Sequence, residues 1–456
     1  MITKITNIFK VPELRNKIAF TAALLFVFRL GGIVLVPGVD REVVKQFVAF
    51  SQTGAGSIFG LYNLFAGGFF SQFSIFALGI MPYISASIII QLLGSVVPYF
   101  QRLQKEGPEG RKKITQLTRY GTVLIASVQA IGVCILLTSL DVSDGTGTGR
   151  FLVSDPSTMF YFTTCIILVT GTVFVMWLGE QITNHGIGNG ISLIIMVGIL
   201  ASLPKVAIQQ VSNLFSDDPS LVTNPFSFII SFILLISIVV FVVLMSTAVR
   251  KIPVSYAKRI VGRKMYGGQA THLPLKILTA GVMPIIFAQA LVIIPTSLAS
   301  FFPNTGFGMF LQRNFGDFTA IPYMFFLFFM IVGFTYFYTA VAFNPVDVAD
   351  NMKKQGGFIP GVRPGKSTAD FIDNILSKIT LPASIFLGFI AVLPNIIARF
   401  SNGGIDISTA SFFGGTSILI LVGVALDTLQ QIESQLLMRN YEGFLKTGKI
   451  KGRKRY

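Results

Sequence analysis

The sequence contains very few of the residues on which catalysis, metal binding and disulfide frameworks depend. Its 456 residues include two cysteines, Cys134 and Cys165, and two histidines, His185 and His272. Two cysteines cannot build a disulfide framework or a four-ligand zinc site, and each is expected to pack as a small buried hydrophobe. No Ser-His-Asp, Cys-His or paired-carboxylate pattern stands out. We therefore expect no catalytic residues, no metal and no cofactor.

Charge is scarce as well. Charged residues make up 12% of the chain, hydrophobic residues make up 52%, and the mean hydropathy is +0.71. These values are typical of a polytopic membrane protein. The net charge of +16 raises the alternative of nucleic-acid binding. However, the basic residues gather in alternate segments between apolar stretches, which is the pattern of membrane topology.

Few charged side chains interrupt the apolar stretches. Arg29 stands in the first stretch, and Asp427 lies near one end of the last. Ion-coupled transporters commonly place titratable side chains inside the bilayer to carry their coupling ions. The scarcity of such residues argues against an ion-coupled carrier and against a membrane metalloenzyme.

Hydropathy predicts ten membrane spans in two halves. Lys and Arg accumulate on the side of the amino terminus, so we expect both termini in the cytosol. The predicted parts are a cytosolic amino terminus (1–17), a first half (18–203), an external loop (204–225), a second half (226–432) and a basic cytosolic tail (433–456). The spans are predicted near residues 18–36, 74–94, 116–138, 157–178, 187–203, 226–246, 274–296, 322–343, 375–394 and 413–432.

One segment of 56 residues, 46–101, contains no charged side chain. A membrane-spanning helix needs ~20 apolar residues, yet this segment must cross an odd number of times because its ends are expected on opposite sides. Glycines break up its first half and exclude three crossings. We therefore predict one full span, preceded by a short apolar piece at about 56–66 that enters the membrane and turns back. Backbone of this kind is tolerated only within protein or a water-filled cavity, so the segment predicts a cavity.

The two halves share a short repeat. Segments 79–88 and 281–290 have Gly, Met, Pro, Ile and Ala in register, in the second span of each half. Because each half has an odd number of spans, the halves must have opposite orientations, and inverted repeats often place the working site between them. Pro82 and Pro284 are expected either merely to kink their helices or to mark two kinked helices that move relative to one another.

Isoleucine recurs at helical spacing in these spans. Ile80, Ile84 and Ile88 share one face of the second span. Ile191 and Ile195 share one face of the fifth span, and Ile286 is the repeat partner of Ile84. Such stripes usually serve helix packing or lipid contact. Together with the predicted cavity, they leave a pore lining as the alternative.

Residues 361–367 resemble a phosphate-binding loop but lack its leading glycine, because that position is Pro360. Pro360 and Pro364 also lack the N–H groups that a phosphate cradle uses. An ATP site is not expected here, so any energy source must be a partner.

Two cytosolic connections, 247–273 and 344–374, are too long to be simple links between spans. The first is rich in basic residues and has no acidic residue, whereas the second mixes both signs. They are expected either to contact lipid head groups or to dock a large anionic or acidic partner.

Several motifs resemble those of one family, the SecY proteins, which are central channel subunits of the bacterial Sec protein translocase. The resemblance covers residues 16 to about 445. Its most specific stretches are SQFSIFALGIMPYISASIIIQL at 71–92, WLGEQITNHGIGNGIS at 177–192, THLPLK at 271–276 and FNPVDVADNMKKQGGFIPGVRPG at 343–365.

The resemblance implies an all-α polytopic membrane protein with ten transmembrane helices in two inverted five-helix halves and a short re-entrant plug helix. By position, the pore ring of the family falls on Ile80, Ile84, Ile191, Ile195, Ile286 and Ile420. The plug falls on Ser57, Ile58, Phe59, Leu61, Tyr62, Asn63 and Phe65. The lateral gate, between spans two and three and spans seven and eight, includes Ser85, Gln91 and Gln289. The residues that would dock a motor protein or the ribosome are Arg263, Lys264 and Arg363.

The resemblance also implies a passive channel without its own NTP site. Such a channel translocates unfolded secretory proteins across the bacterial cytoplasmic membrane and releases transmembrane segments sideways into it. The implied partners are SecE and SecG subunits, the SecA ATPase, the ribosome, signal sequences, nascent chains and anionic lipids, with no DNA. Without the resemblance, a secondary transporter for a small solute ranks nearly level with a channel, and a polytopic membrane enzyme ranks third.

Overall fold

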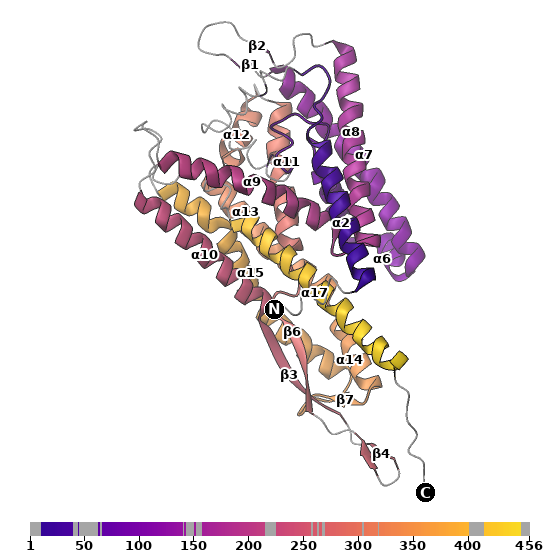
Figure 1. The fold of residues 1–456 in the computed structure, drawn as a ribbon. Coiled ribbons are helices and arrows are strands. Elements are labelled where there is room, and N and C mark those ends of the chain that lie inside the picture. Colours follow the sequence, from indigo (N-terminus) through magenta and orange to yellow (C-terminus); the bar gives the residue numbers. More distant parts are fainter. Residues whose placement is uncertain are drawn as a thin grey trace.

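The computed structural model is a bundle of helices with a β-ribbon at one end (Figure 1). Of the predicted plug, only Asn63 and Ala66 belong to the described residues. The structure describes residues 11–39, 44, 63, 66–139, 141–142, 150–151, 157–214, 225–256, 259–261, 264–266, 270–302, 305–317, 319–400 and 415–447.

The helices of the first half overlap the first five predicted spans, although α9 continues to Leu214, inside the predicted external loop at 204–225. The spans correspond to α2, α5, α7, α8 and α9, and α6 is a short additional helix. The bounds are α2 Pro12–Gly31, α5 Met81–Val96, α6 Pro98–Lys105, α7 Pro108–Ser139, α8 Thr158–His185 and α9 Gly190–Leu214.

The second half repeats this arrangement with five long helices. The predicted spans correspond to α10, α11, α13, α15 and α17, and α12 and α14 are short helices between them. The bounds are α10 Pro225–Thr247, α11 Met283–Phe301, α12 Gly306–Phe315, α13 Ile321–Ala342, α14 Pro345–Lys354, α15 Lys366–Phe400 and α17 Gly415–Thr447.

Several helices are suited to a bilayer by length and composition. Among the described residues, five helices are long and apolar enough to cross a membrane, or six if α5 and α6 count as one broken span. Three further apolar helices are shorter. The helical bundle is therefore that of a multi-pass membrane protein.

Spans two and seven begin later than hydropathy predicts. The residues before α5 form turns as far as Ile80, and those before α11 form turns as far as Val282. Pro82 and Pro284 lie in the first turn of their helices, where a missing N–H costs no helical hydrogen bond. The expectation that these prolines kink their helices was therefore wrong, because each one marks a helix start.

The helix of span two ends in a sharp bend. α5 and α6 are separated by the extended residue Val97 and differ in direction by 97°. Pro98 opens α6. Most of α6 is exposed, and its last turn carries Arg102 and Lys105.

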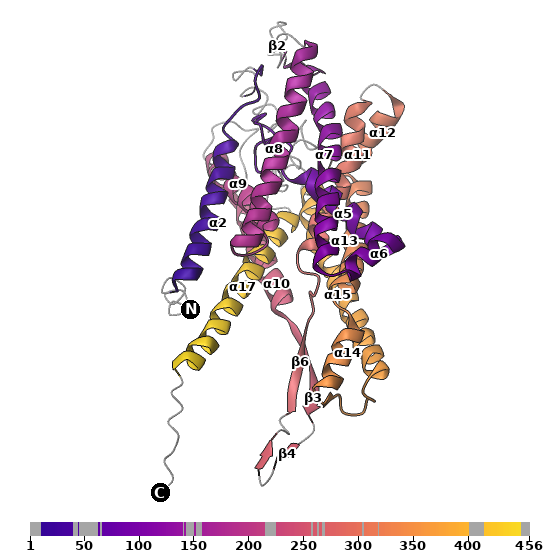
Figure 2. The same ribbon diagram turned by 90° about the vertical axis from the view of Figure 1, so that its right-hand side faces the viewer.

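The two long connections join in one small sheet that the sequence did not predict. β3 (Val249–Tyr256) pairs antiparallel with β6 (Ala270–Lys276) along seven residue pairs and with β7 (Gly357–Phe358) along two. A hairpin of β4 (Arg259–Val261) and β5 (Lys264–Tyr266) extends the ribbon. Figure 2 shows that α14 lies at this same end, and that α2 begins and α17 ends toward it. A second short hairpin, β1 (Asp141–Val142) with β2 (Arg150–Phe151), lies at the opposite end of the bundle.

Candidate functional site

The largest apolar cluster contains all six predicted pore-ring isoleucines. Five of them are at most 3% exposed, and Ile191 is partly buried and packs against the others. They come from α9, α11, α17 and the start of α5, and so from both halves of the chain. α5 contacts α11, and α9 contacts α17, so the cluster fills the space where the halves meet. The residues are Ile80, Ile84, Ile191, Ile195, Ile286 and Ile420.

The sequence repeat has the same backbone geometry in both copies. Gly79 and Gly281 have φ angles of 57° and 60°, in the left-handed region that glycine adopts readily. Each glycine N–H donates to the carbonyl three residues earlier, over 2.8 Å to Phe76 and 3.2 Å to Leu278. A helix starts two residues after each glycine. This shared turn places Ile84 and Ile286 at equivalent positions on α5 and α11.

A polar cavity of about 410 Å³ lies next to the isoleucine cluster. It is bounded by the turn at Gly281 and Val282 and by one face of α17. Lys276 Nζ donates a hydrogen bond to Gln430 Oε1 there. The N–H of Gly188, in the turn between α8 and α9, donates to Gln431 Oε1 over 3.0 Å, which joins the two halves. The polar lining includes Asn189, Lys276, Asp427, Gln430, Gln431 and Ser434.

Sequence reasoning missed this polar face of α17, although a signal was present. Asp427, Gln430, Gln431 and Ser434 are spaced by three or four residues, which places them on one side of a helix. A polar stripe on a predicted span indicates a face turned toward water or toward a polar partner.

The predicted plug lies mainly outside the described residues. Ser57, Ile58, Phe59, Leu61, Tyr62 and Phe65 belong to the part that is not described. The Asn63 carbonyl accepts a hydrogen bond from Gly68 N over 2.7 Å, and Asn63 Oδ1 accepts one from Ser71 N over 2.9 Å. Asn63 therefore closes a turn that leads into the segment before α5.

Arg29 holds the same segment from α2. Its Nη1 donates to the Gly67 carbonyl over 2.7 Å, and its guanidinium lies 5.0 Å from the ring centre of Phe69. Gly67 has a φ angle of 74°, and a Cβ at this position would lie 3.1 Å from the Cα of Gly198 in α9. The lone charge in the first span thus anchors irregular backbone between α2 and α9.

The predicted gate residues lie on the expected helices, but their hydrogen bonds stay within one half. Ser85 is buried on α5, and Gln91 donates to Ser87 Oγ on the same helix over 3.1 Å. Gln289, which is 1% exposed, donates from α11 to Thr416 Oγ1 on α17 over 3.1 Å. Helices α5 and α7 both contact α11, so the two sides of the predicted gate are adjacent.

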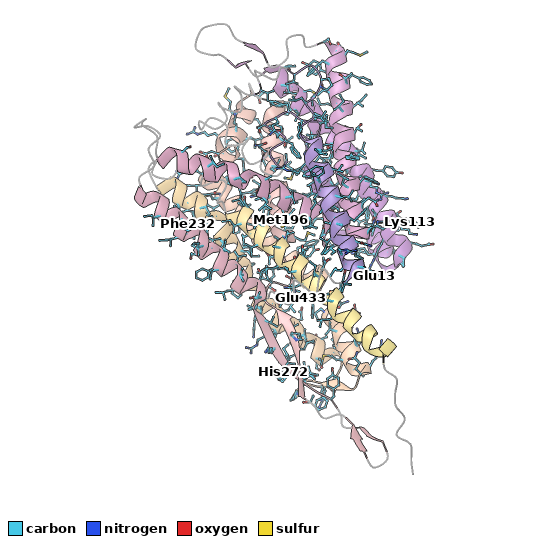
Figure 3. All side chains as sticks on the ribbon, viewed as in Figure 1. Glu13, Lys113, Met196, Phe232, His272 and Glu433 are labelled. Carbon is cyan, nitrogen blue, oxygen red and sulfur yellow. The ribbon has the colours of Figure 1, made fainter. Side chains whose placement is uncertain are left out.

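The predicted docking residues gather at the end of the molecule that carries the ribbon. Lys264 begins β5, and Arg263 lies outside the described residues. Arg363 is exposed in the turn between β7 and α15, and its carbonyl accepts a hydrogen bond from Thr368 Oγ1 over 2.9 Å. Figure 3 also places His272 on this ribbon, whereas Met196 lies within the bundle.

Helices α7 and α8 are joined by a charged pair that the sequence did not reveal. Arg119 lies within the predicted third span, and its Nε and Nη2 donate to the two carboxylate oxygens of Glu180 over 3.0 and 2.6 Å. Such a bidentate pair fixes the relative orientation of its two partners. The pair therefore keeps one predicted gate helix with the rest of the first half.

Comparison with known proteins agrees with this arrangement. The SecY family model matches residues 74–429. The chain is 44% identical to the protein translocase subunit SecY of Streptomyces coelicolor over 449 residues, covering 98% of this chain and all of the relative. It is also 44% identical to the SecY of Bacillus subtilis over 448 residues, with the same coverage.

Solved structures share the fold at low sequence identity. A structure described as a protein-conducting channel aligns with a TM-score of 0.63 at 18% identity, covering 95% of this chain and 94% of that one. Sec61 in the canine ribosome–channel complex aligns with a TM-score of 0.58 at 16% identity, with the same coverage. With a family match over more than half of its length and relatives of 44% identity along nearly all of it, this chain belongs to the SecY family.

Proposed function

We propose that the protein is a passive, gated channel for unfolded polypeptides. The observation that carries this proposal is the isoleucine cluster, which lies between the two halves and beside a polar cavity. Isoleucine is β-branched and stiff at χ1, so six such side chains make a narrow apolar collar. The collar can close around a moving chain without strong preference for its sequence. Narrow apolar constrictions also impede ions because water leaves them.

The path through the channel runs from the polar cavity to the collar. Asn189, Lys276 and Gln431 line that cavity with polar groups that can hydrogen-bond water. A polypeptide that enters it stays hydrated until it reaches the isoleucines. In the resting channel, the plug covers the collar from the external side.

Transmembrane segments leave sideways through the gate between α5 and α7 on one side and α11 and α13 on the other. The ion pair between Arg119 and Glu180 supports this route, since it holds α7 to α8. When α5 and α7 move away from α11, each half moves as a unit. A signal sequence or nascent transmembrane helix occupies the opening and then enters the lipid.

Movement is driven by a partner at the ribbon end, either the SecA ATPase or a translating ribosome. The exposed Arg363 and the hairpin at Lys264 lie at this end, where β3 pairs with β7 and so joins the two long connections. We place this end in the cytosol, where basic residues accumulate, together with both termini. The membrane is the bacterial cytoplasmic membrane, and small SecE- and SecG-type subunits complete the complex.

Ion leak tests the collar directly. Replacing Ile84, Ile286 and Ile420 together with glycine widens the constriction and admits water, so we expect a severalfold rise in ion conductance of reconstituted channels. The matched control replaces Ile88, Ile293 and Ile418, which are buried in the same cluster on the same three helices. Unchanged conductance in the first variant, or an equal rise in both, would contradict the collar.

The path of the polypeptide needs its own measurement. A photoreactive side chain at Ile84 or Ile286 should cross-link to a secretory precursor stalled during translocation. The same probe at the exposed Phe232 of α10, on the outer surface of the bundle (Figure 3), serves as the control. A precursor that reacts only at Phe232 would place the path outside the bundle and refute the proposal.

A further inference from the structure

The two cysteines of this chain meet between α7 and α8. Cys134 Sγ and Cys165 Sγ are 3.7 Å apart, although 31 residues separate them in the sequence. Cys134 is fully buried and Cys165 is half-buried. Cys165 also packs against a small apolar cluster that includes Ala130 and Leu168. The sequence has only these two thiols, so the whole thiol content of the chain lies at this one contact.

Two polar contacts flank the thiols in the same antiparallel register. Tyr161 Oη donates to Thr138 Oγ1 over 3.1 Å, four residues from the cysteines on both helices. On the other side of the thiols, Arg119 binds Glu180. Arg119 lies fifteen residues before Cys134 on α7, and Glu180 lies fifteen residues after Cys165 on α8. The helices are thus aligned on both sides of the thiols, so the sulfurs are held opposite one another by the register of the whole pair.

The thiols lie near the end of the bundle opposite the ribbon. Cys134 is five residues before the end of α7, and Cys165 is seven residues after the start of α8. At a rise of 1.5 Å per residue, both lie about 8–10 Å from the helix ends that carry the β1–β2 hairpin. With the sidedness proposed above, this depth is in the outer leaflet, next to the oxidising side of the membrane.

We propose that Cys134 and Cys165 form a modification site, at which a lipid-soluble quinone oxidises the two thiols to a disulfide that links α7 to α8. The two S–H bonds break and one S–S bond forms. The quinone accepts two electrons and two protons and becomes the hydroquinone. Two molecules of a membrane-permeant thiol reverse the reaction by thiol–disulfide exchange and are released as their own disulfide. A disulfide is ~2.04 Å long, so the sulfurs must approach by ~1.7 Å for the bond to form. Cys165, the half-buried thiol, is the group that the oxidant reaches first.

The test counts free thiols in the full-length chain with its partner subunits in proteoliposomes. A short-chain ubiquinone analogue is added, and the protein is then denatured and labelled with a maleimide-linked polyethylene glycol. The untreated chain should carry two labels, and the quinone-treated chain none. Intact mass should fall by about two hydrogen atoms, and treatment with dithiothreitol should restore both labels.

Variants distinguish disulfide formation between these two cysteines from nonspecific oxidation of thiols. Cys134→Ser and Cys165→Ser should each retain one label after quinone treatment. A positional control combines Cys165→Ser with Ile166→Cys, which moves the thiol to the next, exposed position of α8. This control should keep both of its labels under conditions that remove both from the natural chain.

Three results would overturn the site. They are two labels remaining after quinone treatment, equal label loss in the positional control, or a gain of oxygen mass without a disulfide. The readout is independent of protein translocation, so a failure here leaves the proposed channel function unaffected. If the collar test fails, the thiol result can still be interpreted.

Discussion

At the scale of the residue, Arg29 shows how a single charge can stabilise irregular backbone in a membrane protein. A carbonyl outside a helix needs a donor, and lipid cannot supply one. Arg29 satisfies the Gly67 carbonyl and rests on the ring of Phe69, so its charge has both a hydrogen-bond acceptor and an aromatic face. The same contact holds the segment that leads to Ile80, the first isoleucine of the proposed collar.

Replacing Arg29 by Met should destabilise this segment. The apolar stem is retained, but the Gly67 carbonyl loses its donor, which costs about 1–3 kcal/mol. We expect a lower thermal unfolding midpoint for the purified complex and a higher ion leak in liposomes. Arg399 is the matched control, because its Nη1 donates to the Thr319 carbonyl over 2.9 Å at an exposed position. Arg399→Met should change stability by less than about 0.5 kcal/mol, and equal effects of the two variants would exclude a special role for Arg29.

Buried polar side chains act at the same scale. Gln289 donates to Thr416 Oγ1, while its own Oε1 has no hydrogen-bond partner among the described residues. Because the pair joins α11 to α17, it reinforces the second half. The family resemblance put Gln289 on a predicted gate helix, but the direction of its side chain follows from the packing of α17.

At the scale of the element, the turn before α5 and the turn before α11 are the clearest mark of the internal repeat. Hydropathy placed the spans but extended both helices backward, because turn residues and helix residues are equally apolar there. Backbone geometry decides the difference. A glycine in the left-handed region and a proline in the first helical turn together set each helix start.

Gly79→Ala and Gly281→Ala should have similar costs. An alanine in the left-handed region is disfavoured by roughly 1–2 kcal/mol, and no severe clash adds to this at Gly281, where a Cβ would lie 3.4 Å from Asp427 Oδ2. We expect both variants to lower the unfolding midpoint, with nearly additive effects in the double variant. Thermal unfolding of the purified complex measures this.

Gly333→Ala is the control, and it should change the stability in the opposite direction. Gly333 is an exposed helical position of α13, and a Cβ there would meet no atom within 4 Å. Alanine should stabilise the protein by up to about 1 kcal/mol, because glycine is the poorer helix former. If Gly79→Ala or Gly281→Ala also stabilised the protein, the left-handed turn would not be a requirement of the repeat.

At the scale of the whole molecule, two halves meet through an apolar cluster and share one polar end. The connection between α10 and α11 and the connection between α13 and α15 were predicted as separate loops, and the structure joins them through β3, β6 and β7. An apolar core of Ile252, Val254 and Ile372, among others, supports this sheet. The proposed partner would therefore contact two connections that β3, β6 and β7 hold together.

Arg363→Glu should abolish SecA-driven export while the protein remains folded in the membrane. Arg363 is exposed, so its substitution removes no core contact, but it reverses the charge offered to an acidic partner. ATP-driven translocation into proteoliposomes measures the effect, and we expect a loss of at least tenfold. Arg313→Glu, at the exposed end of α12, should leave export unchanged. Normal export by Arg363→Glu would remove this turn from the motor contact.

The sequence by itself determined the membrane class, the number of spans and the short repeat shared by the halves, and its resemblance to the SecY family located the six isoleucines. The membrane class and the spans depend on hydropathy and charge sidedness, which act within single segments. The tertiary structure decided which side chains meet: Arg29 with Gly67, Arg119 with Glu180, Cys134 with Cys165, and the six isoleucines in one cluster. The physical reason is that these contacts join residues from different helices, and their positions follow from packing and helix register, which no local pattern in the sequence encodes.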